Sequence, residues 1–229
     1  KNNSILRQKI KLFEPSTAVQ AAYQQPTGSR FGGDAMYAGE NKKSGALLSY
    51  YFNVKDNDTL NKISTDSLFL KFYDGENLIR TLKKKAPKES GFYKWVWRMD
   101  EKGKQRPSRK IKKNNFESSG VQVKPGNYKV ELSYSKERSY SNIIVISDPR
   151  IHKNEKSDEL YNSLKELDEL LQKSADIVKQ LVESKITVTT LKSRLNKLDK
   201  KAFKEDVDLS DSIIKEIDEL ISLFLGKID

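Results

Sequence analysis

The one group of side chains whose types and spacing could bind a ligand lies near the middle of the chain. Tyr93, Trp95 and Trp97 alternate with other residues, so a β-strand would place their three rings on one face. Such rings can stack on sugars or bases, and Lys94 and Arg98 stand beside them in the sequence. Alternatively the two indoles fill a core, which we favour because a domain of this size needs large core residues. Tyr93, Trp95, Lys94 and Arg98 are therefore the candidate ligand-binding residues.

Groups suited to acid–base, nucleophilic or metal chemistry are few. The chain has one histidine, His152, so no multi-histidine metal site can form within it, and we interpret His152 as a surface or interface residue. The lack of cysteine excludes disulfides, thiolate metal ligands and cysteine nucleophiles. We expect no catalytic residue, no metal site, no cofactor and no enzymatic activity. A hydrolase acting through Asp34 or Glu40 remains an alternative.

Two short motifs could bind ions but are incomplete. Asp56 and Asp58 have the spacing that begins a calcium-binding loop, yet the downstream glycine and glutamate of an EF-hand are missing, so we predict a turn. Gly28, Gly32 and Gly33 could cradle a phosphate, but no Gly-Lys-Ser/Thr follows them. We interpret this glycine-rich stretch as flexible backbone.

The net charge of +11 is concentrated in one stretch. Residues 83–113 contain 13 basic and 3 acidic residues, a difference of +10, whereas residues 150–229 contain 15 basic and 17 acidic residues, a difference of −2. Such a stretch could meet nucleic acid or an anionic polysaccharide. It could also be a solvated loop and a strand edge protected by lysines, which is the interpretation we favour.

The first two thirds of the chain have the pattern of an antiparallel β-structure. Short segments in which apolar and polar residues alternate are separated by turn signals such as Asp74-Gly75 and Pro125-Gly126. The predicted strands are residues 46–53, 67–73, 77–82, 91–99, 128–134 and 141–147. Strands of this kind without βαβ alternation predict an immunoglobulin-like antiparallel sandwich. We expect residues 102–119, which are basic and polar, to form a mobile connection between strands.

The N-terminal residues 1–44 are predicted to be an extended segment that leads in from an upstream domain. Residues 4–13 end in an alternating run that suits a short strand, and Glu14-Pro15 ends that strand. Residues 16–44 are rich in Gly, Gln, Ala and Ser and have no sustained period, which indicates a long irregular segment.

After Asp148-Pro149 the hydrophobic period changes to that of helices. Apolar residues from Leu160 to Leu181 follow spacings of three and four, the pattern of a helix that packs on another helix or on the sandwich. The first helix is predicted to run from an N-cap at Ser157 to Glu183, with a break at the β-branched residues 186–190. A final helix over residues 209–225, capped by Ser210 or Asp208, completes a helical hairpin or small bundle.

Several motifs, taken in order, resemble one family. Residues 4–8, SILRQ, look like the exit from the last blade of a β-propeller, and residues 31–52 are similar to an Asn-Pro-Pro-x-Gly-Ala lead into a first sandwich strand. Residues 91–100 resemble a Gly-x-Asn-x-x-x-Trp-Asp strand, residues 125–132 a Pro-Gly-x-Tyr-x-Val-x-Leu strand, and residues 148–150 an Asp-Pro-Arg end. The chain thus resembles the C-terminal region of secreted bacterial sortilin-like, glycosyl-hydrolase-like β-propeller proteins with Asp-box (BNR-type) repeats.

The resemblance is not complete, and it transfers no catalytic residue. Lys42 and Lys43 stand where that family has two prolines, and Tyr93 and Arg98 stand where it has asparagine and aspartate. The resemblance implies that an upstream β-propeller would carry any ligand site and that this chain is its accessory part. It also implies a secreted, periplasmic or cell-surface location.

The sequence therefore predicts an extended segment over residues 1–44, a sandwich over 45–148 and a helical hairpin over 155–229. The working hypothesis is a non-catalytic, structural module of a larger secreted protein that contacts the upstream propeller of the same polypeptide. The alternatives are a carbohydrate-binding module that uses the exposed aromatics to bind polysaccharide, and a binder of nucleic acid or other polyanions that uses residues 83–113. We expect no nucleic-acid partner, and no run approaches the roughly 20 apolar residues of a membrane span.

Overall fold

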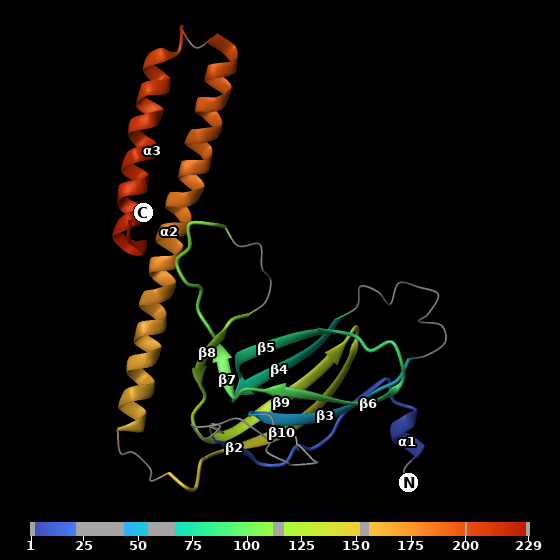
Figure 1. Ribbon diagram of the computed structural model, residues 1–229. Helices are drawn as coiled ribbons and strands as arrows, with labels where there is room; N and C mark the ends of the chain where they lie inside the picture. The colour runs from blue at the N-terminus through green and yellow to red at the C-terminus, as the bar shows by residue number, and fades with distance from the viewer. Residues whose placement is uncertain are drawn as a thin grey trace, which may run out of the picture. The chain divides into compact units, whose positions relative to one another are not determined.

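The computed structural model describes residues 3–21, 44–54, 67–111, 117–151, 156–199 and 201–227, which fall into two compact units. The β unit comprises Lys1–Lys102 and Ser119–Tyr161, and the helical unit comprises Gly103–Ser118 and Asn162–Asp229. The chain is therefore mainly β at first and α afterwards, as the sequence predicted (Figure 1).

Three antiparallel or mixed sheets make up the β unit. A short helix α1 (Asn3–Leu6) precedes the described strands, which are β1 (Ile10–Leu12), β2 (Ala18–Gln20), β3 (Ala46–Phe52), β4 (Ser67–Asp74), β5 (Asn77–Lys85), β6 (Gly91–Trp97), β7 (Asp100–Lys102), β8 (Ser119–Gln122), β9 (Gly126–Tyr134) and β10 (Glu137–Ser147). One sheet has the order β1-β3-β6, the second β2-β10-β9-β4-β5, and the third pairs β7 with β8.

The core of the β unit lies between the three-stranded and the five-stranded sheets. Trp97 of β6 is fully buried, and its ring stacks on Phe72 of β4 with 4.1 Å between centroids. Tyr128 of β9 meets the same indole edge-on at 5.7 Å. The prediction that Trp97 belongs to the core is confirmed, and the physical reason is that its side of β6 faces the apolar side of the second sheet.

The N-terminal segment does more than lead into the β unit, because it contributes a strand to each large sheet. β1 pairs antiparallel with β3, whereas β2 pairs parallel with β10. Between these two pairings, the backbone N–H of Leu12 donates to the Ser139 hydroxyl of β10 at 2.8 Å. Residues 22–43, most of the predicted irregular segment, lie outside the described residues.

Two hairpins have tight turns that require unusual backbone angles. Gly75 has φ +56° in the turn between β4 and β5, as expected from the Asp74-Gly75 signal. The last hairpin turns at Ser135 and Lys136, and Ser135 itself has φ +51°. β10 is therefore longer than predicted, since it begins at Glu137 directly after this turn.

Gly45 allows β3 to begin close to β6. It has φ +112°, and a Cβ atom there would lie 2.4 Å from the carbonyl oxygen of Trp97. A side chain would therefore push β3 away from β6 at the point where Ala46 pairs with Trp97.

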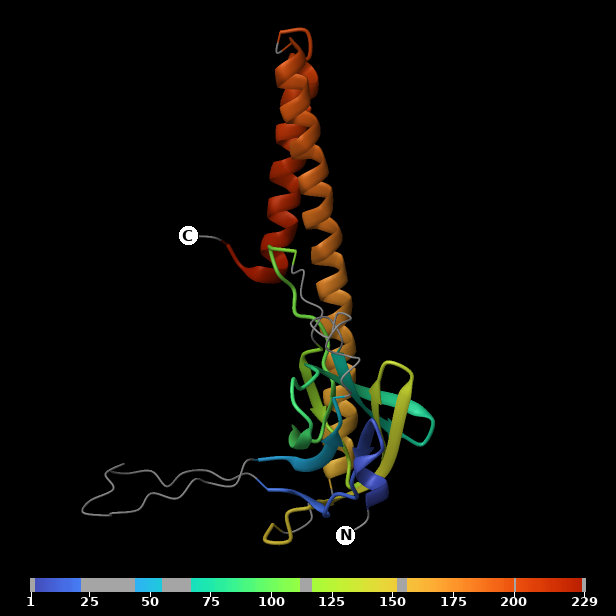
Figure 2. The same cartoon turned by 90° about the vertical axis from the view of Figure 1, so that its right-hand side faces the viewer.

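Most of the helical unit consists of two antiparallel helices, α2 (Ser157–Asp199), which enters this unit at Asn162, and α3 (Lys204–Leu225). They lie side by side along α3 in both views (Figure 1 and Figure 2). Val178 and Val182 of α2 pack on Ile217 and Ile221 of α3. Neither helix has a described stretch that is long and apolar enough to cross a membrane.

The predicted break in α2 at residues 186–190 is wrong, because the helix continues through this segment to Asp199. The hydroxyls of Thr187, Thr189 and Thr190 each donate to the carbonyl four residues earlier, at distances of 2.7 to 3.0 Å. These bonds satisfy the polar groups of β-branched residues within the helix, so their low helix propensity does not end it.

The predicted caps of both helices also differ from the structure. α3 begins at Lys204, four residues before Asp208, and Ser210 lies inside it with its hydroxyl donating to the Asp206 carbonyl at 2.7 Å. Ser157 is the first helical residue of α2 rather than the residue before it. Acidic residues occupy the first turn of each helix, where the helix dipole favours negative charge.

Replacing Trp97 by alanine is expected to lower the free energy of unfolding by about 3 to 5 kcal/mol, because it opens a cavity beside Phe72 and Tyr128. Urea unfolding followed by circular dichroism measures the change. The matched control is Phe92→Ala on the same strand, where the ring is 69% exposed and the expected change is within about 0.5 kcal/mol. Equal losses in the two variants would contradict the assignment of Trp97 to the core.

Candidate functional site

Tyr93 and Trp95 lie on the inner side of β6, at the edge of its sheet. Both are partly buried and pack against the core, with ring centroids 5.7 Å and 6.3 Å from Tyr50. The Tyr93 hydroxyl also donates to the Glu89 carbonyl at 2.6 Å. These two rings therefore pack at the border of the core and do not form an open platform on which a ligand could stack.

The cations predicted to accompany these rings lie elsewhere. Lys94 alternates with Tyr93 and Trp95 along β6, is exposed, and pairs with Ser49 on the opposite face of the sheet. Arg98 is exposed just after β6 ends. The cation that does lie over Trp95 is Lys84 of β5, with its ammonium 5.9 Å from the ring. The structure brings Tyr93 and Trp95 together and separates them from Lys94 and Arg98.

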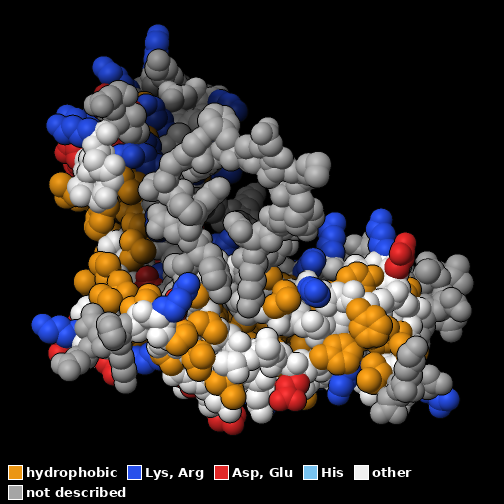
Figure 3. Space-filling model, turned by 60° about the horizontal axis from the view of Figure 1, so that its bottom comes forward, with side chains coloured by type: hydrophobic (Ala, Val, Ile, Leu, Met, Phe, Trp, Pro, Cys, Tyr) orange, Lys and Arg blue, Asp and Glu red, His pale blue; other side chains and the backbone are white. Residues whose placement is uncertain are grey.

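Sequence reasoning missed a second aromatic group, on the outer face of the three-stranded sheet. The Phe92 ring lies 5.2 Å from Tyr51 and 5.9 Å from Phe13. Phe92 is 69% exposed. The alternation of side chains along β6 could have revealed this group, because Phe92 and Trp97 point to opposite faces of the sheet. Tyr51 of β3 pairs with Phe92 and so lies on the same outer face. Apolar side chains gather on the face of the β unit that Figure 3 turns to the viewer.

The outer face of the five-stranded sheet holds a hollow of about 500 Å³. Its walls come from four strands and the β9–β10 turn, and they combine cations, hydroxyls and one aromatic ring. The lining residues are Ser67, Phe69, Lys71, Lys83, Ser133, Ser135 and Arg138. Lys83 belongs to the basic stretch noted in the sequence, but Lys71 and Arg138 are distant from each other in sequence and only strand pairing brings them together.

A buried carboxylate organises two of these cations. The Glu131 side chain is 10% exposed, and one of its oxygens lies 3.8 Å from the Lys71 ammonium and 3.6 Å from the Arg138 guanidinium. The Tyr73 hydroxyl donates to its other oxygen at 3.2 Å. Burial and the neighbouring carboxylate raise the pKa of Tyr73, so this phenol remains a donor.

Burial also perturbs tyrosines in the core. Loss of hydration raises the pKa of Tyr50 to about 12 and that of Tyr128 to about 12. The Tyr128 hydroxyl donates to the Lys124 carbonyl at 2.6 Å. On the acidic side, hydrogen bonds from Arg150 lower the pKa of Asp148 to about 2, at the point where β10 ends.

The first turn of α2 is tied to the β unit by polar contacts. The Tyr161 hydroxyl donates to the Glu101 carboxylate, and burial raises the pKa of that phenol. The Lys124 ammonium lies 2.8 Å from the Asp158 carboxylate and 4.6 Å from the Tyr161 ring centroid. Residues 157–161 of α2 therefore belong to the β unit.

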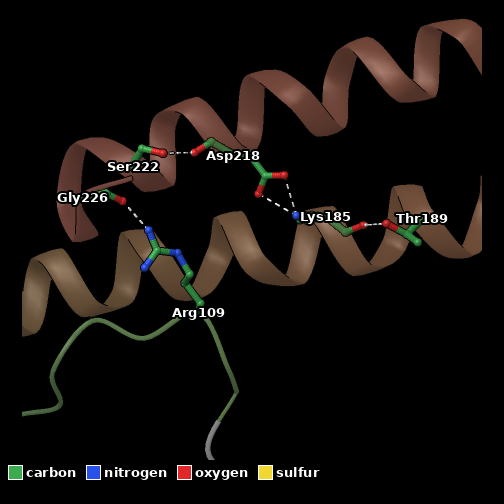
Figure 4. Close-up of polar contacts among 6 residues, drawn as sticks. All are labelled: Arg109, Lys185, Thr189, Asp218, Ser222 and Gly226. Atoms are coloured by element: carbon green, nitrogen blue, oxygen red, sulfur yellow. Dashed lines mark hydrogen bonds and ion pairs between the residues drawn. The ribbon is translucent and has the colours of Figure 1, made fainter. Parts of the chain in front are cut away.

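The basic connection predicted to be mobile belongs in its described parts to the helical unit. The backbone N–H of Gln105 donates to the Gln172 side chain at 3.0 Å. The Arg109 guanidinium donates to the carbonyl of Gly226, at the C-terminal end of α3 (Figure 4). Beside it, the Lys185 ammonium lies 2.6 Å from the Asp218 carboxylate and joins the two helices. A cation at a helix C-terminus is favoured by the helix dipole, so this loop is anchored by charge.

Several other residues considered from the sequence lie outside the described residues. They are Gly28, Gly32, Gly33, Asp34, Glu40, Asp56, Asp58 and His152. Within the described part of the chain, no group of three or more His, Asp or Glu side chains is placed to hold a metal ion.

Comparison of the sequence with protein-family models found no match, and neither the search of curated proteins nor that of solved structures found a similar protein.

Stability is expected to fall as the pH rises from about 10 to about 12, because an unfolded tyrosine ionises near its ordinary pKa of about 10 while Tyr50 and Tyr128 stay protonated to about 12 in the fold. Below pH 10 both states are protonated and this contribution is complete. Urea midpoints measured across this range give the dependence of the free energy of unfolding on pH.

Tyr128→Phe should lower the free energy of unfolding by about 1 kcal/mol at pH 8, because the hydrogen bond to the Lys124 carbonyl is lost. It should also make the fall of stability with rising pH shallower, because one tyrosine with a raised pKa is removed. An unchanged slope would contradict the assignment.

Arg109→Ala is expected to loosen the last turn of α3 by about 0.3 to 1 kcal/mol, because it removes the cation at Gly226. Hydrogen exchange of the amides near the end of α3 measures this effect. Arg106→Ala is the matched control, since it makes the same charge change at an exposed position of the same loop. Equal exchange rates in the two variants would show that the contact does not stabilise the helix end.

Proposed function

We propose that this chain is a non-catalytic accessory module of a larger secreted protein and that it works through contacts with other parts of that protein. The observation that carries the proposal is the surface of the helical unit. Among the described residues of this unit, six apolar ones are buried: Ala175, Val178, Val182, Val207, Ile217 and Ile221. Twelve large ones are exposed: Ile111, Leu164, Leu167, Leu170, Ile177, Ile186, Leu191, Leu198, Leu209, Leu220, Leu223 and Phe224.

Such a balance is typical of a protein-binding element. Exposed apolar residues occur singly on most proteins, but a group of them at helical spacing marks a surface that another protein covers. On α3, Leu220, Leu223 and Phe224 form such a group, and Leu223 is 81% exposed. On α2, Leu164 and Leu167 belong to the apolar run that was predicted to pack on another helix or on the sandwich, and both are exposed.

We propose that the occupant of this surface is the upstream propeller of the same polypeptide, as the resemblance to sortilin-like proteins suggests. We further propose that the β unit is an immunoglobulin-like sandwich. The strand orders β1-β3-β6 and β2-β10-β9-β4-β5 support this, since they separate the strands as the two sheets of such a sandwich do. The bond from the Tyr128 hydroxyl to the Lys124 carbonyl supports it too, because it resembles a tyrosine corner.

Carbohydrate binding through Tyr93 and Trp95 has less support. The Tyr93 hydroxyl is already bonded to Glu89, and both rings pack on Tyr50 at the border of the core. A stacking platform needs an open ring face, and here Lys84 lies over Trp95.

The proposal is tested with Leu223→Ser and Phe224→Ser in two polypeptides, the 229-residue chain and a longer one that includes the upstream coding sequence. In the 229-residue chain each change should alter the free energy of unfolding by no more than about 0.5 kcal/mol, because both side chains are exposed. In the longer polypeptide, hydrogen exchange of α3 should be slower than in the short chain, and either change should abolish this protection.

The control is Lys215→Ser, a polar change on α3 that should leave exchange the same in the longer polypeptide. If α3 exchanges equally fast in both polypeptides, the upstream part does not cover this surface and the proposal is wrong. Loss of protection on Lys215→Ser as well would show a general effect on the helix rather than a contact of the apolar group.

A further inference from the structure

We propose that the hollow on the outer face of the five-stranded sheet binds an anionic saccharide, one that bears carboxylate or sulfate groups. This site lies on the β unit, and it is distinct from both the aromatic residues of β6 and the apolar surface of α3. It is therefore independent of the protein contacts proposed above.

The strand register places the binding groups in one row. Lys83 of β5 pairs with Phe69 of β4, Phe69 pairs with Ser133 of β9, and Ser133 pairs with Arg138 of β10. Residues opposite one another on neighbouring strands have side chains on the same face. The two cations therefore stand at the ends of a row that has an aromatic ring and a hydroxyl between them, and Lys71 adds a third cation to the hollow.

The cations are held in place before any ligand arrives. Glu131 lies within 3.8 Å of Lys71 and 3.6 Å of Arg138, so its buried carboxylate restrains both side chains. The Lys83 ammonium lies 5.6 Å from the centroid of the Phe69 ring. With Lys71, Lys83 and Arg138 against Glu131, the local charge is +3 − 1 = +2, so a second anion remains favourable after the carboxylate is counted. Restrained cations lose less entropy on binding than free ones.

The composition of the hollow favours a saccharide over nucleic acid. Its volume of about 500 Å³ lies in the range of small-ligand sites, which are about 300 to 1,000 Å³. The hydroxyls of Ser67 and Ser135 can exchange hydrogen bonds with sugar hydroxyls, and cations can pair with carboxylates or sulfates. A nucleic-acid site would instead need cations in a track and open rings for base stacking. Here the cations surround a hollow, and the one ring faces Lys83.

The test is isothermal titration calorimetry of the full chain at about 0.15 M salt, which screens charges beyond about 8 Å. The probes are a short oligogalacturonate with its methyl ester as the uncharged match, and a sulfated dextran oligomer with neutral dextran as its match. At least one charged saccharide should bind, and its uncharged match should not. Lys83→Gln should weaken binding about tenfold, the effect of losing one charge-assisted hydrogen bond.

Lys84→Gln is the matched control. It makes the same charge change on the same strand, but its ammonium lies over Trp95 on the other face of the sheet. It should weaken binding less than about twofold, because a distant surface charge is screened. Lys83 is exposed, so Lys83→Gln is expected to fold, and its urea midpoint verifies this.

Six results would overturn the proposal. Neither charged saccharide binds, or the uncharged matches bind equally well. The two lysine variants weaken binding equally, which would indicate net charge alone, or Lys84→Gln weakens it more, which would place the ligand at Trp95. A DNA duplex that binds through Lys83 while the saccharides do not would assign the hollow to nucleic acid. If inorganic phosphate binds as tightly as the saccharides, the hollow recognises any anion and has no specificity for a saccharide.

Discussion

The β unit depends on one packing arrangement, the burial of Trp97 between its two large sheets. The indole stacks on Phe72 of the opposite sheet, and its N–H donates to the Asp100 carbonyl at 2.9 Å. This satisfies the polar group of a large side chain while its apolar surface is removed from water. Trp97 and Phe72 thus join the inner faces of the two sheets, while strand pairing sets which side chains are neighbours on the outer faces.

The outer faces of the two large sheets carry the side chains that are not used in the core. On the five-stranded sheet, the pairing of β5, β4, β9 and β10 gathers Lys83, Lys71 and Arg138 around a hollow. On the three-stranded sheet, the pairing of β3 with β6 places Tyr51 beside Phe92, and Phe13, just after β1, lies next to the Phe92 ring. One surface is charged and hydroxylated, and the other is aromatic. The two surfaces differ because side chains alternate between the two faces of a strand, and only those on the outer face are free to differ from an apolar core.

The helical unit follows a different principle. Its two helices bury only a narrow stripe between them, because two packed helices cover one side of each other. Polar contacts help to hold it together, with Lys185 bonded to Asp218 and Arg109 to the end of α3. The apolar residues that remain exposed are more than such a hairpin can bury alone, and this is the physical basis of the protein contact proposed above.

The sequence by itself determined the change from strands to helices near Asp148, most strand positions, the Asp74-Gly75 hairpin and the burial of Trp97, because these depend on local periodicity and turn chemistry. It wrongly ended α2 at residues 186–190, since β-branched residues suggest a break unless their hydroxyls are bonded within the helix. Only the tertiary structure decided which residues meet. Lys71 and Lys83 share the hairpin at Asp74-Gly75, but Arg138 lies 55 residues after Lys83, and no period along the chain encodes that β9 will pair with β4.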